Sequence, residues 1–308
     1  MYLDKALNYL LAEVGNNPLV EVVVSDNAST DDTAAVVQGY ADKYSNVKYY
    51  CNEKNLGIDG NIHNAYEKST GKYVLISGDD DYFKVGTVAF ILELLQKNNT
   101  VTMLKLMPLQ GNVNLVYNYI RQDLGDQKIM ELINSTNCLC QVGAGLVNFV
   151  SKVSIATTWI STTVLRRDAY MLIADRHRFD DSMIAHIYYH LAVLKYAPKW
   201  LVVYGNFLRS DSGLYDGGYS YNTPQVFIKN YFDILGCFKE INKDLMSREK
   251  LNMMINHVIP CVNRAVYENL EFHYDGFAEI IRRYYADEPY LEQAIGQIQE
   301  IINKRRRL

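Results

Sequence analysis

The sequence predicts an α/β protein in which a mostly parallel sheet is flanked by helices and followed by a helical C-terminal region. Strand and helix patterns alternate over the first hundred residues, acidic clusters follow two of the apolar strands, and helical periodicity dominates after residue 223. Alternating strands and helices form parallel sheets with right-handed crossovers, and such sheets bind ligands at the carboxyl ends of their strands.

Composition narrows the class of protein. Of 308 residues, 49% are hydrophobic and 21% charged, and the net charge is −4. These values are typical of a folded globular chain and argue against a general nucleic-acid binder, which needs a basic surface. The sequence has no run of 18 uncharged apolar residues and no signal-peptide pattern, and its five cysteines are scattered. We therefore expect a cytoplasmic protein with reduced thiols.

The first elements follow from local patterns. Apolar residues recur with helical spacing over 3–14, and Gly15 and Pro18 end that helix. The β-branched run 20–24 predicts a strand that is buried on both faces. The polar residues 29–32 then supply helix caps. The pattern continues with a helix over 33–44, a strand over 47–50, a helix over 60–68 and a strand over 73–77.

The remaining chain is divided between a sheet-containing part and a helical part. Apolar patterns predict strands over 101–109, 155–165 and 200–204, helical periodicity over 112–133 and a helix over 183–194. The segment 210–221 is rich in Gly, Ser, Asp and Tyr, a composition typical of mobile loops. These patterns place one region at 1–205 and a second at 206–308.

Three consecutive aspartates, Asp79, Asp80 and Asp81, follow the strand 73–77. Adjacent carboxylates repel one another unless they are solvated or paired. A divalent cation resolves this repulsion, and Mg²⁺ typically combines one or two protein carboxylates with substrate phosphates. The cluster therefore indicates a Mg²⁺ or Mn²⁺ site for a phosphorylated ligand; the alternative is a solvated turn that caps a helix.

Asp26 and Asn27 follow the strand 20–24 and precede a capped helix. A carboxylate at the end of such a strand can accept hydrogen bonds from a nucleobase or a ribose. The alternative interpretation is that both residues only shape the turn.

These segments occur together with Asn55-Leu56-Gly57 and Thr70-Gly71-Lys72. In that order they resemble the family 2 glycosyltransferases of GT-A fold. The forms Ser25-Asp26-Asn27-Ala28-Ser29, Asp59-Gly60-Asn61 and Gly78-Asp79-Asp80-Asp81 resemble the abequosyltransferase-like branch, which builds surface polysaccharides. The resemblance implies an inverting, metal-dependent transferase that moves a sugar from a nucleotide-sugar donor to a glycan or lipid-linked acceptor.

The resemblance also implies roles for single residues. Nucleotide binding falls to Asp26, Asn27, Asn55, Gly57, Asp79 and Asp80. Asp81 is the main ligand of a Mn²⁺ or Mg²⁺ ion, with Asp79 close to the metal or the sugar. The sequence departs from the usual form because Gly78 stands where the family has its first aspartate. Arg209 and Ser210 match a short motif that approaches the diphosphate, where an arginine stabilises the leaving group.

Asp180 and Asp181 precede an apolar helix. The resemblance implies a general base in an acidic pair at the start of such a helix, so we expect Asp181 to be the base and Asp180 the reserve. The alternative is that the two residues are the N-cap and first residue of the helix and stabilise its dipole.

The resemblance further implies a strand and a turn before the first helix, and this sequence lacks them. We expect the chain to be an N-terminally shortened form, which leaves a non-catalytic nucleotide-sugar-binding or scaffold protein as the alternative function. The basic end, Lys304-Arg305-Arg306-Arg307, also predicts peripheral contact with the inner face of the plasma membrane; its alternative is a solvated helix end.

Overall fold

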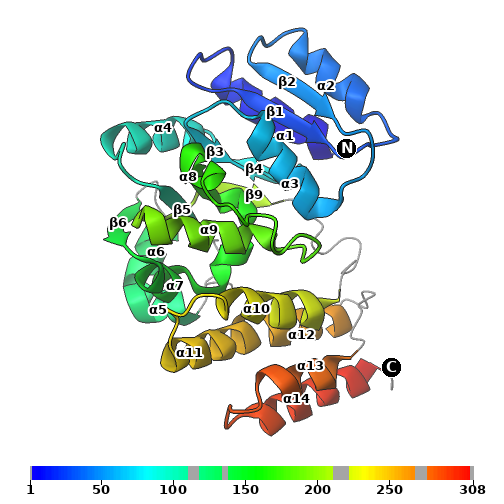
Figure 1. Cartoon of the computed structure of the whole chain (residues 1–308), viewed down its shortest axis with the longest axis vertical. Helices are drawn as coiled ribbons and strands as arrows, with labels where there is room; N and C mark the ends of the chain where they lie inside the picture. The colour runs from blue at the N-terminus through cyan, green and yellow to red at the C-terminus, as the bar shows by residue number, and fades with distance from the viewer. Residues whose placement is uncertain (1, 110–117, 134–137, 211–221, 268–275, 306–308) are drawn as a thin grey trace.

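The computed structural model describes residues 2–109, 118–133, 138–210, 222–267 and 276–305. A two-stranded parallel pair lies at one end of the molecule, a five-stranded sheet in the middle, and the helices that follow residue 223 at the other end (Figure 1). Among the described residues, no helix is both long and apolar enough to cross a membrane.

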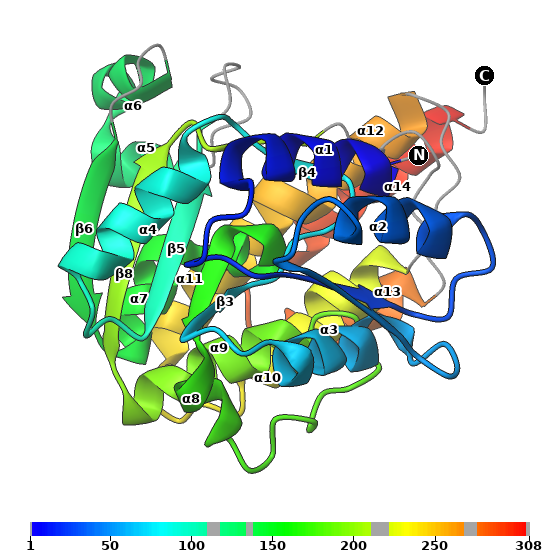
Figure 2. The same ribbon diagram turned by 90° about the horizontal axis from the view of Figure 1, so that it is seen from above.

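The N-terminal unit is built around β1 (Val22–Asp26) and β2 (Val47–Cys51), which pair in parallel. Helices α1 (Tyr2–Val14) and α2 (Thr33–Ala41) lie on one side of this pair and α3 (Gly57–Lys68) on the other (Figure 2). Leu7 and Leu11 of α1 and Val37 of α2 are buried against the strands. These elements confirm the alternation that the sequence predicted. Within the described chain, β1 pairs with β2 alone.

The central sheet is mixed rather than mostly parallel. Its order is β3 (Tyr73–Leu75), β7 (Thr163–Arg166), β5 (Met103–Pro108), β8 (Lys199–Gly205) and β6 (Leu139–Ala144). Only β5 and β8 pair in parallel; the other three pairings are antiparallel. The expectation of a parallel sheet thus fails beyond β5, because β6 and β7 run back along the sheet as short antiparallel strands.

A separate antiparallel pair of strands connects the acidic turn with the segment that follows β8. Strand β4 (Asp81–Phe83) pairs with β9 (Leu208–Ser210), and helix α4 (Thr87–Lys97) follows β4. The sequence patterns did not predict β4 or β9, because each has only three residues. Their pairing brings together residues that lie more than 120 positions apart.

The prediction of one strand over 155–165 is wrong. The segment forms two short 3₁₀ helices, η2 (Ser154–Thr158) and η3 (Ile160–Thr162), and becomes a strand only at β7. The hydroxyls of Thr157, Thr158 and Thr162 each donate to the carbonyl oxygen three residues earlier. Such local bonds compete with strand pairing, so the β-branched composition is misleading here.

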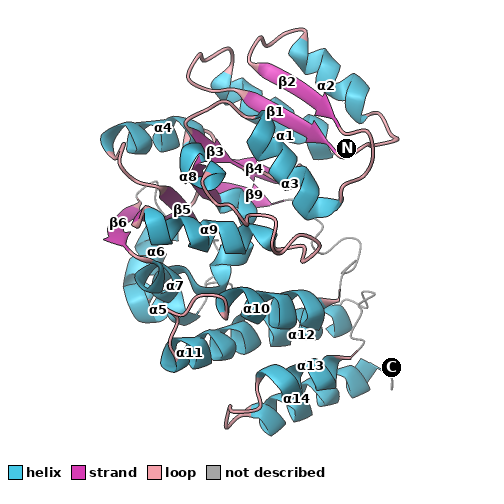
Figure 3. Ribbon diagram, viewed as in Figure 1, coloured by secondary structure: helices cyan, strands magenta, loops and turns pink. Residues whose placement is uncertain are grey.

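Further helices complete the molecule. Where the structure describes it, the sheet-containing part also has five helices, which are α5 (Asn118–Leu124), α6 (Asp126–Ile133), α7 (Leu146–Val153), α8 (Arg167–Met171) and α9 (Ala185–Tyr196). The later part contains the π-helix η4 (Pro224–Asn230), α10 (Tyr231–Leu235), α11 (Lys243–Met253), the π-helix η5 (Met254–Val258), α12 (Ile259–Tyr267), α13 (Phe277–Tyr284) and α14 (Leu291–Arg305). Helix predominates there, as predicted (Figure 3).

One hydrophobic core connects the sheet-containing part with the helices that follow it. Tyr189 of α9 and Trp200 of β8 belong to the same buried cluster as Phe227, Phe232 and Ile281 of the later helices. Helix α9 is central to this cluster, since ten of its residues are buried. The loop predicted over 210–221 lies outside the described residues except for Ser210.

Candidate functional site

Two of the three consecutive aspartates, Asp80 and Asp81, lie close to Gly78. A Cβ atom at position 78 would lie 2.6 Å from Oδ1 of Asp80 and 3.8 Å from Oδ2 of Asp81. The shorter of these distances is a clash, so the absent side chain makes room for the Asp80 carboxylate. Oδ2 of the buried Asp81 accepts a hydrogen bond from Nε1 of Trp159 at 3.0 Å, whereas Asp79 is exposed. The departure at position 78 therefore has a structural reason.

The acidic turn is fixed at both ends. The amide of Gly78 donates to Oγ of Ser161 at 2.9 Å. In the β4–β9 pair, Asp81 lies opposite Ser210 and Tyr82 opposite Arg209. The structure thus brings the residues expected at the metal next to those expected at the diphosphate. Carboxylate oxygens are the ligands that Mg²⁺ and Mn²⁺ prefer, so the turn has suitable donor chemistry.

Asp26 ends β1 and is buried. Its Oδ1 accepts a hydrogen bond from the amide of Ser29 at 2.9 Å, and its Oδ2 accepts one from the hydroxyl of Tyr49 at 2.5 Å. Burial alone would raise the pKa of Asp26, but the hydrogen bonds from Ser29 and Tyr49 outweigh it and hold the pKa below its ordinary value. Asp26 therefore shapes the turn and also remains an ionised acceptor at the end of the strand.

Asn27 bonds two other residues that the sequence analysis predicted, Asn55 and Gly57. Its Nδ2 donates to Oδ1 of Asn55 at 2.9 Å and to the carbonyl of Gly57 at 3.2 Å. Its Oδ1 accepts from the amide of Leu56 at 2.8 Å. Gly57 has a φ of +74°, the left-handed conformation that glycine adopts without strain. The predicted residues Asn27, Asn55 and Gly57 thus form one group at the carboxyl end of β1.

Four further polar residues extend this group. Asn61 and Asn64, three positions apart on α3, both bond Ser25 of β1, and both bond the side chain of Asn52. We call Ser25, Asn27, Asn52, Asn55, Asn61 and Asn64 the amide network. The sequence analysis missed Asn52 and Asn64 and gave Ser25 and Asn61 no role. The spacing of Asn61 and Asn64 on one helix face was the signal that could have found them.

Asp59 of α3 points to a different part of the chain. Its Oδ2 accepts the amide of Met183 at 2.7 Å and its Oδ1 accepts the amide of Ala185 at 3.1 Å. Burial, together with the charges of Asp180 and Asp181, raises the pKa of Asp59 to about 6 against the lowering effect of these two hydrogen bonds. The sequence analysis gave Asp59 no role because its partners lie more than 120 residues away.

Asp180 lies between two histidines. Nε2 of His63 lies 2.8 Å from its Oδ1, and Nδ1 of His177 lies 2.9 Å from its Oδ2. A carboxylate only accepts hydrogen bonds, so both imidazoles donate to it. The hydroxyl of Tyr170 lies 2.5 Å from Nδ1 of His63, and burial lowers the pKa of His63, which favours its neutral form. Both oxygens of Asp180 are therefore engaged.

His63, His177 and Asp180 are also a group that could hold a metal ion, since one ligand atom from each lies within 4.8 Å of the others. Two imidazole nitrogens and a carboxylate suit Zn²⁺ better than Mg²⁺. Any such ion would have to replace both hydrogen bonds of Asp180. The hydrogen-bonded arrangement already engages both oxygens of Asp180 and both ring nitrogens of His63.

Asp181 differs from its neighbour. It is exposed, it has a φ of +69°, and its side chain makes no hydrogen bond or ion pair with any residue that the structure describes. Helix α9 begins at Ala185, with Ile184 as its N-cap. The interpretation of Asp180 and Asp181 as N-cap and first helical residue is therefore wrong. The carboxylate of Asp59 interacts with the helix N-terminus in their place.

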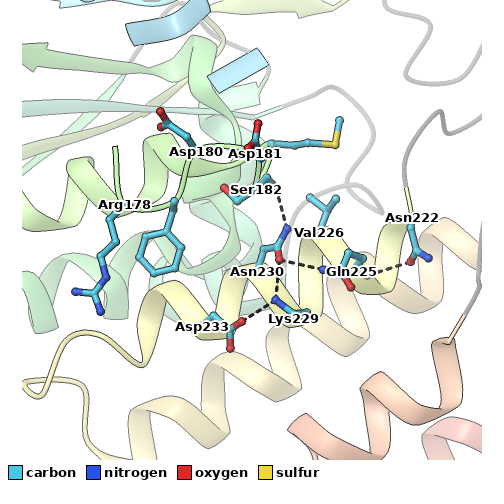
Figure 4. A pocket seen from close by; sticks show the side chains of 12 residues that line it. Arg178, Asp180, Asp181, Ser182, Asn222, Gln225, Val226, Lys229, Asn230 and Asp233 are labelled. Carbon is cyan, nitrogen blue, oxygen red and sulfur yellow. Dashed lines mark hydrogen bonds and ion pairs between the residues drawn. The ribbon is translucent and has the colours of Figure 1, made fainter. Parts of the chain in front are cut away.

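Asp180 and Asp181 also line a pocket of about 530 Å³ between segment 178–183 and the π-helix η4. Figure 4 shows the two aspartates on one side and Asn222, Gln225 and Lys229 on the other. Nδ2 of Asn230 donates to the carbonyl of Ser182 at 3.0 Å and joins the two walls. The pocket is lined mainly by polar side chains that can bind hydroxyl groups.

Comparison with known proteins identifies a family for the first half of the chain and a fold for the whole. The family model described as glycosyl transferase family 2 matches residues 1–151. GalNAc(5)-diNAcBac-PP-undecaprenol beta-1,3-glucosyltransferase of Campylobacter jejuni is 35% identical over 81 residues, 26% of this chain and 25% of the relative. Abequosyltransferase RfbV of Salmonella typhimurium is 32% identical over 91 residues, 29% of this chain and 27% of the relative. Each match thus spans only about a quarter of the curated relative.

Solved structures resemble the whole chain. S. aureus TarS 1–349 in complex with UDP-GlcNAc has a TM-score of 0.54 at 18% identity, covering 99% of this chain and 86% of that one. The mannosyltransferase PcManGT from Pyrobaculum calidifontis, in complex with GDP-Man and Mn²⁺, has a TM-score of 0.52 at 12% identity, covering 99% and 83%. At such identities the likeness establishes the GT-A fold. The family match itself covers residues 1–151, and it assigns this part of the chain to glycosyl transferase family 2.

Proposed function

We propose that this chain is an inverting glycosyltransferase that moves a sugar from a nucleotide-sugar donor to a glycan or lipid-linked acceptor in surface polysaccharide synthesis. The observation that carries the proposal is the acidic turn, in which Asp80 and Asp81 lie near Gly78 and whose strand β4 pairs with Arg209 and Ser210 of β9. The bound UDP-GlcNAc and GDP-Man of the two structural relatives support a sugar nucleotide as donor. The undecaprenol-linked name of the Campylobacter relative supports a lipid-linked acceptor.

The proposed donor site has two parts. Asp26, Asn27, Asn55, Gly57 and Asp80 would contact the nucleotide. Asp81 and Asp79 would hold Mn²⁺ or Mg²⁺, because carboxylate oxygens are the ligands that such ions prefer. When bound, the metal would supply positive charge against the diphosphate. Arg209 and Ser210 would add contacts to the same leaving group.

Asp181 is the proposed general base. It would accept the proton of the acceptor hydroxyl while the hydroxyl oxygen attacks the anomeric carbon on the face opposite the departing diphosphate. Its exposure and its lack of a side-chain partner among the described residues favour it over Asp180, whose two oxygens already accept from His63 and His177.

The proposal also covers the organisation of the chain. Residues 1–205 would form the nucleotide-sugar-binding and catalytic domain, and 206–308 a loop and helical region. The protein would be cytoplasmic, and its basic C-terminal end, which includes Lys304, would contact the inner face of the plasma membrane. Residues 306–308 lie outside the described residues.

A donor panel tests this function. Purified protein is incubated with UDP-, GDP-, CDP- and dTDP-sugars and Mn²⁺, and nucleotide release is measured with and without an acceptor extract. We expect release from one donor class, and Asp81→Asn should reduce it at least about 100-fold. Asp126→Asn, an exposed aspartate on α6, is the matched control. Tight nucleotide-sugar binding without release by the wild type would favour the non-catalytic binding or scaffold function instead.

A further inference from the structure

The segment that carries the proposed base has an unusual backbone. Asp181 and Met183 have φ values of +69° and +66°, a region that residues other than glycine rarely adopt. Only Ser182 separates them. Such a conformation persists when surrounding contacts hold it in place. The contacts that hold this segment therefore decide where the Asp181 side chain points.

Helix α3 supplies those contacts from one face. Asp59 accepts the amides of Met183 and Ala185, which lie beyond Asp181 in the chain. His63, four residues after Asp59 and so on the same face of α3, bonds the side chain of Asp180, which lies just before Asp181. Helix α3 thus holds the backbone on both sides of Asp181 by hydrogen bonds, while the Asp181 carboxylate stays exposed.

Asp59 and His63 are buried, whereas the proposed base Asp181 is exposed. The exposed fractions of Asp59 and His63 are both 3%. Their contacts are direct and pair a carboxylate with backbone N–H groups and an imidazole with a carboxylate, which are strong hydrogen bonds. Neither residue touches the exposed carboxylate of Asp181 itself. They can affect chemistry at Asp181 through the backbone between them and, in the case of Asp59, also through the repulsion between the two carboxylates.

We propose that Asp59, assisted by His63, is a positioning residue that sets the direction of the Asp181 carboxylate toward the acceptor. This inference rests on the proposed function, because it assumes that Asp181 is the base. It adds to that function a requirement for a carboxylate on α3 that belongs neither to the acidic turn nor to the acidic pair.

Asp59→Asn is the first test. The amide side chain has the same shape but only one acceptor oxygen, so it keeps one of the two backbone bonds. We expect kcat to fall about 10- to 100-fold, since misplacing a reacting group by about 1 Å costs roughly that much. KM for the donor and the affinity for the free nucleotide should stay within about 2-fold, because Asp59 makes no contact with the amide network.

Asp31→Asn is the matched control. Asp31 accepts the amide of Thr33 at the start of α2 and so caps a helix as Asp59 does, but at an exposed position. Its substitution should leave kcat unchanged. A fall in both kcat and nucleotide affinity for Asp59→Asn would indicate general loss of structure and would overturn the proposal, as would unchanged kcat.

Amide hydrogen exchange gives a readout that does not depend on turnover. The segment 179–186 should exchange at least about 10-fold faster in Asp59→Asn than in the wild type, with α2 and β5 unchanged. Unchanged exchange in this segment refutes the positioning role of Asp59 even if the protein turns over no donor. Faster exchange in a protein with no turnover of any donor would locate the failure in the proposed function instead.

His63→Gln is the second variant, used if Asp59→Asn does not fold. It weakens the contact to Asp180 without touching the amides at the start of α9. The expected result is again a lower kcat with unchanged nucleotide affinity and faster exchange over 179–186. Wild-type values of both quantities would overturn the proposal.

Discussion

Two buried aspartates on opposite sides of α3 show how differently the same group behaves in one site. Asp26 and Asp59 are 4% and 3% exposed, and each accepts two hydrogen bonds. The pKa of Asp26 is nevertheless lowered, whereas that of Asp59 is raised to about 6. The difference lies in the surroundings: burial prevails at Asp59, which also faces the negative charges of Asp180 and Asp181.

The comparison assigns different properties to the two sides of the helix. On the Asp26 side, amides that do not titrate bond one another and the pKa of Asp26 is lowered, so ligand binding on this side should not change with pH above about 4. On the Asp59 side, carboxylates and histidines face one another around the proposed base. This side should respond to pH near 6 and should control turnover rather than nucleotide affinity.

Loss of the base should have the largest effect. Asp181→Asn is expected to reduce kcat about 10²- to 10⁴-fold, the range that general bases contribute, because the acceptor proton then has no local acceptor. Nucleotide affinity, measured by calorimetry, should stay unchanged, since the amide network lies on the other side of α3. Asp180→Asn should have the smaller effect of the two; the reverse order would make Asp180 the base.

The pH dependence of stability is the next largest effect. The pKa of Asp59 is about 6 in the folded chain against an ordinary value of 3.8, so the folded state binds this proton more tightly than the unfolded state. Its contribution is therefore present below pH 4 and is lost as the pH rises to 6, by about 3 kcal/mol. Urea unfolding at several pH values should show this loss in the wild type and not in Asp59→Asn. Equal pH dependence of both proteins would contradict the comparison.

Asn27→Ala should disturb the other side. It removes the acceptor of the Leu56 amide and the donor to Asn55 and Gly57, which should cost about 2 kcal/mol of stability and about 10-fold or more in nucleotide affinity. The hydrogen exchange of segment 179–186 should not change. Asn16→Ala, which removes an amide bonded to Ser45 outside the site, is the control.

Tyr49→Phe should have the smallest effect. It removes the hydroxyl that donates to Asp26, so stability should fall by about 1 kcal/mol at neutral pH. Because the pKa of Asp26 is lowered, its contribution to stability is present above pH 4 and is lost as the pH falls below that value, the opposite sign to Asp59. The difference between Tyr49→Phe and the wild type should therefore shrink in acid. Tyr40→Phe, which loses a bond to Asp4, serves as control.

Local patterns predicted the N-terminal unit well. Helix α1, strands β1 and β2, and helix α3 all occur within a few residues of their expected bounds. The motif resemblance assigned Asn27, Asn55 and Gly57 to one nucleotide site, and the structure groups them where β1 ends and α3 begins, about thirty positions apart in the chain. Prediction failed at segment 155–165, where hydroxyl groups bonded the local backbone, and at the antiparallel strands β6 and β7.

The sequence by itself determined the order of strands and helices in the first hundred residues, the motifs that resemble glycosyl transferase family 2 and the acidic turn after β3, because each depends on neighbours along the chain. Only the tertiary structure decided that Asp59 faces Met183 and Ala185, that Asp180 lies between His63 and His177, and that Ser210 lies opposite Asp81. These contacts join residues mostly more than a hundred positions apart. Local propensity carries no information about such pairs, since they form only when the helices and sheets pack together.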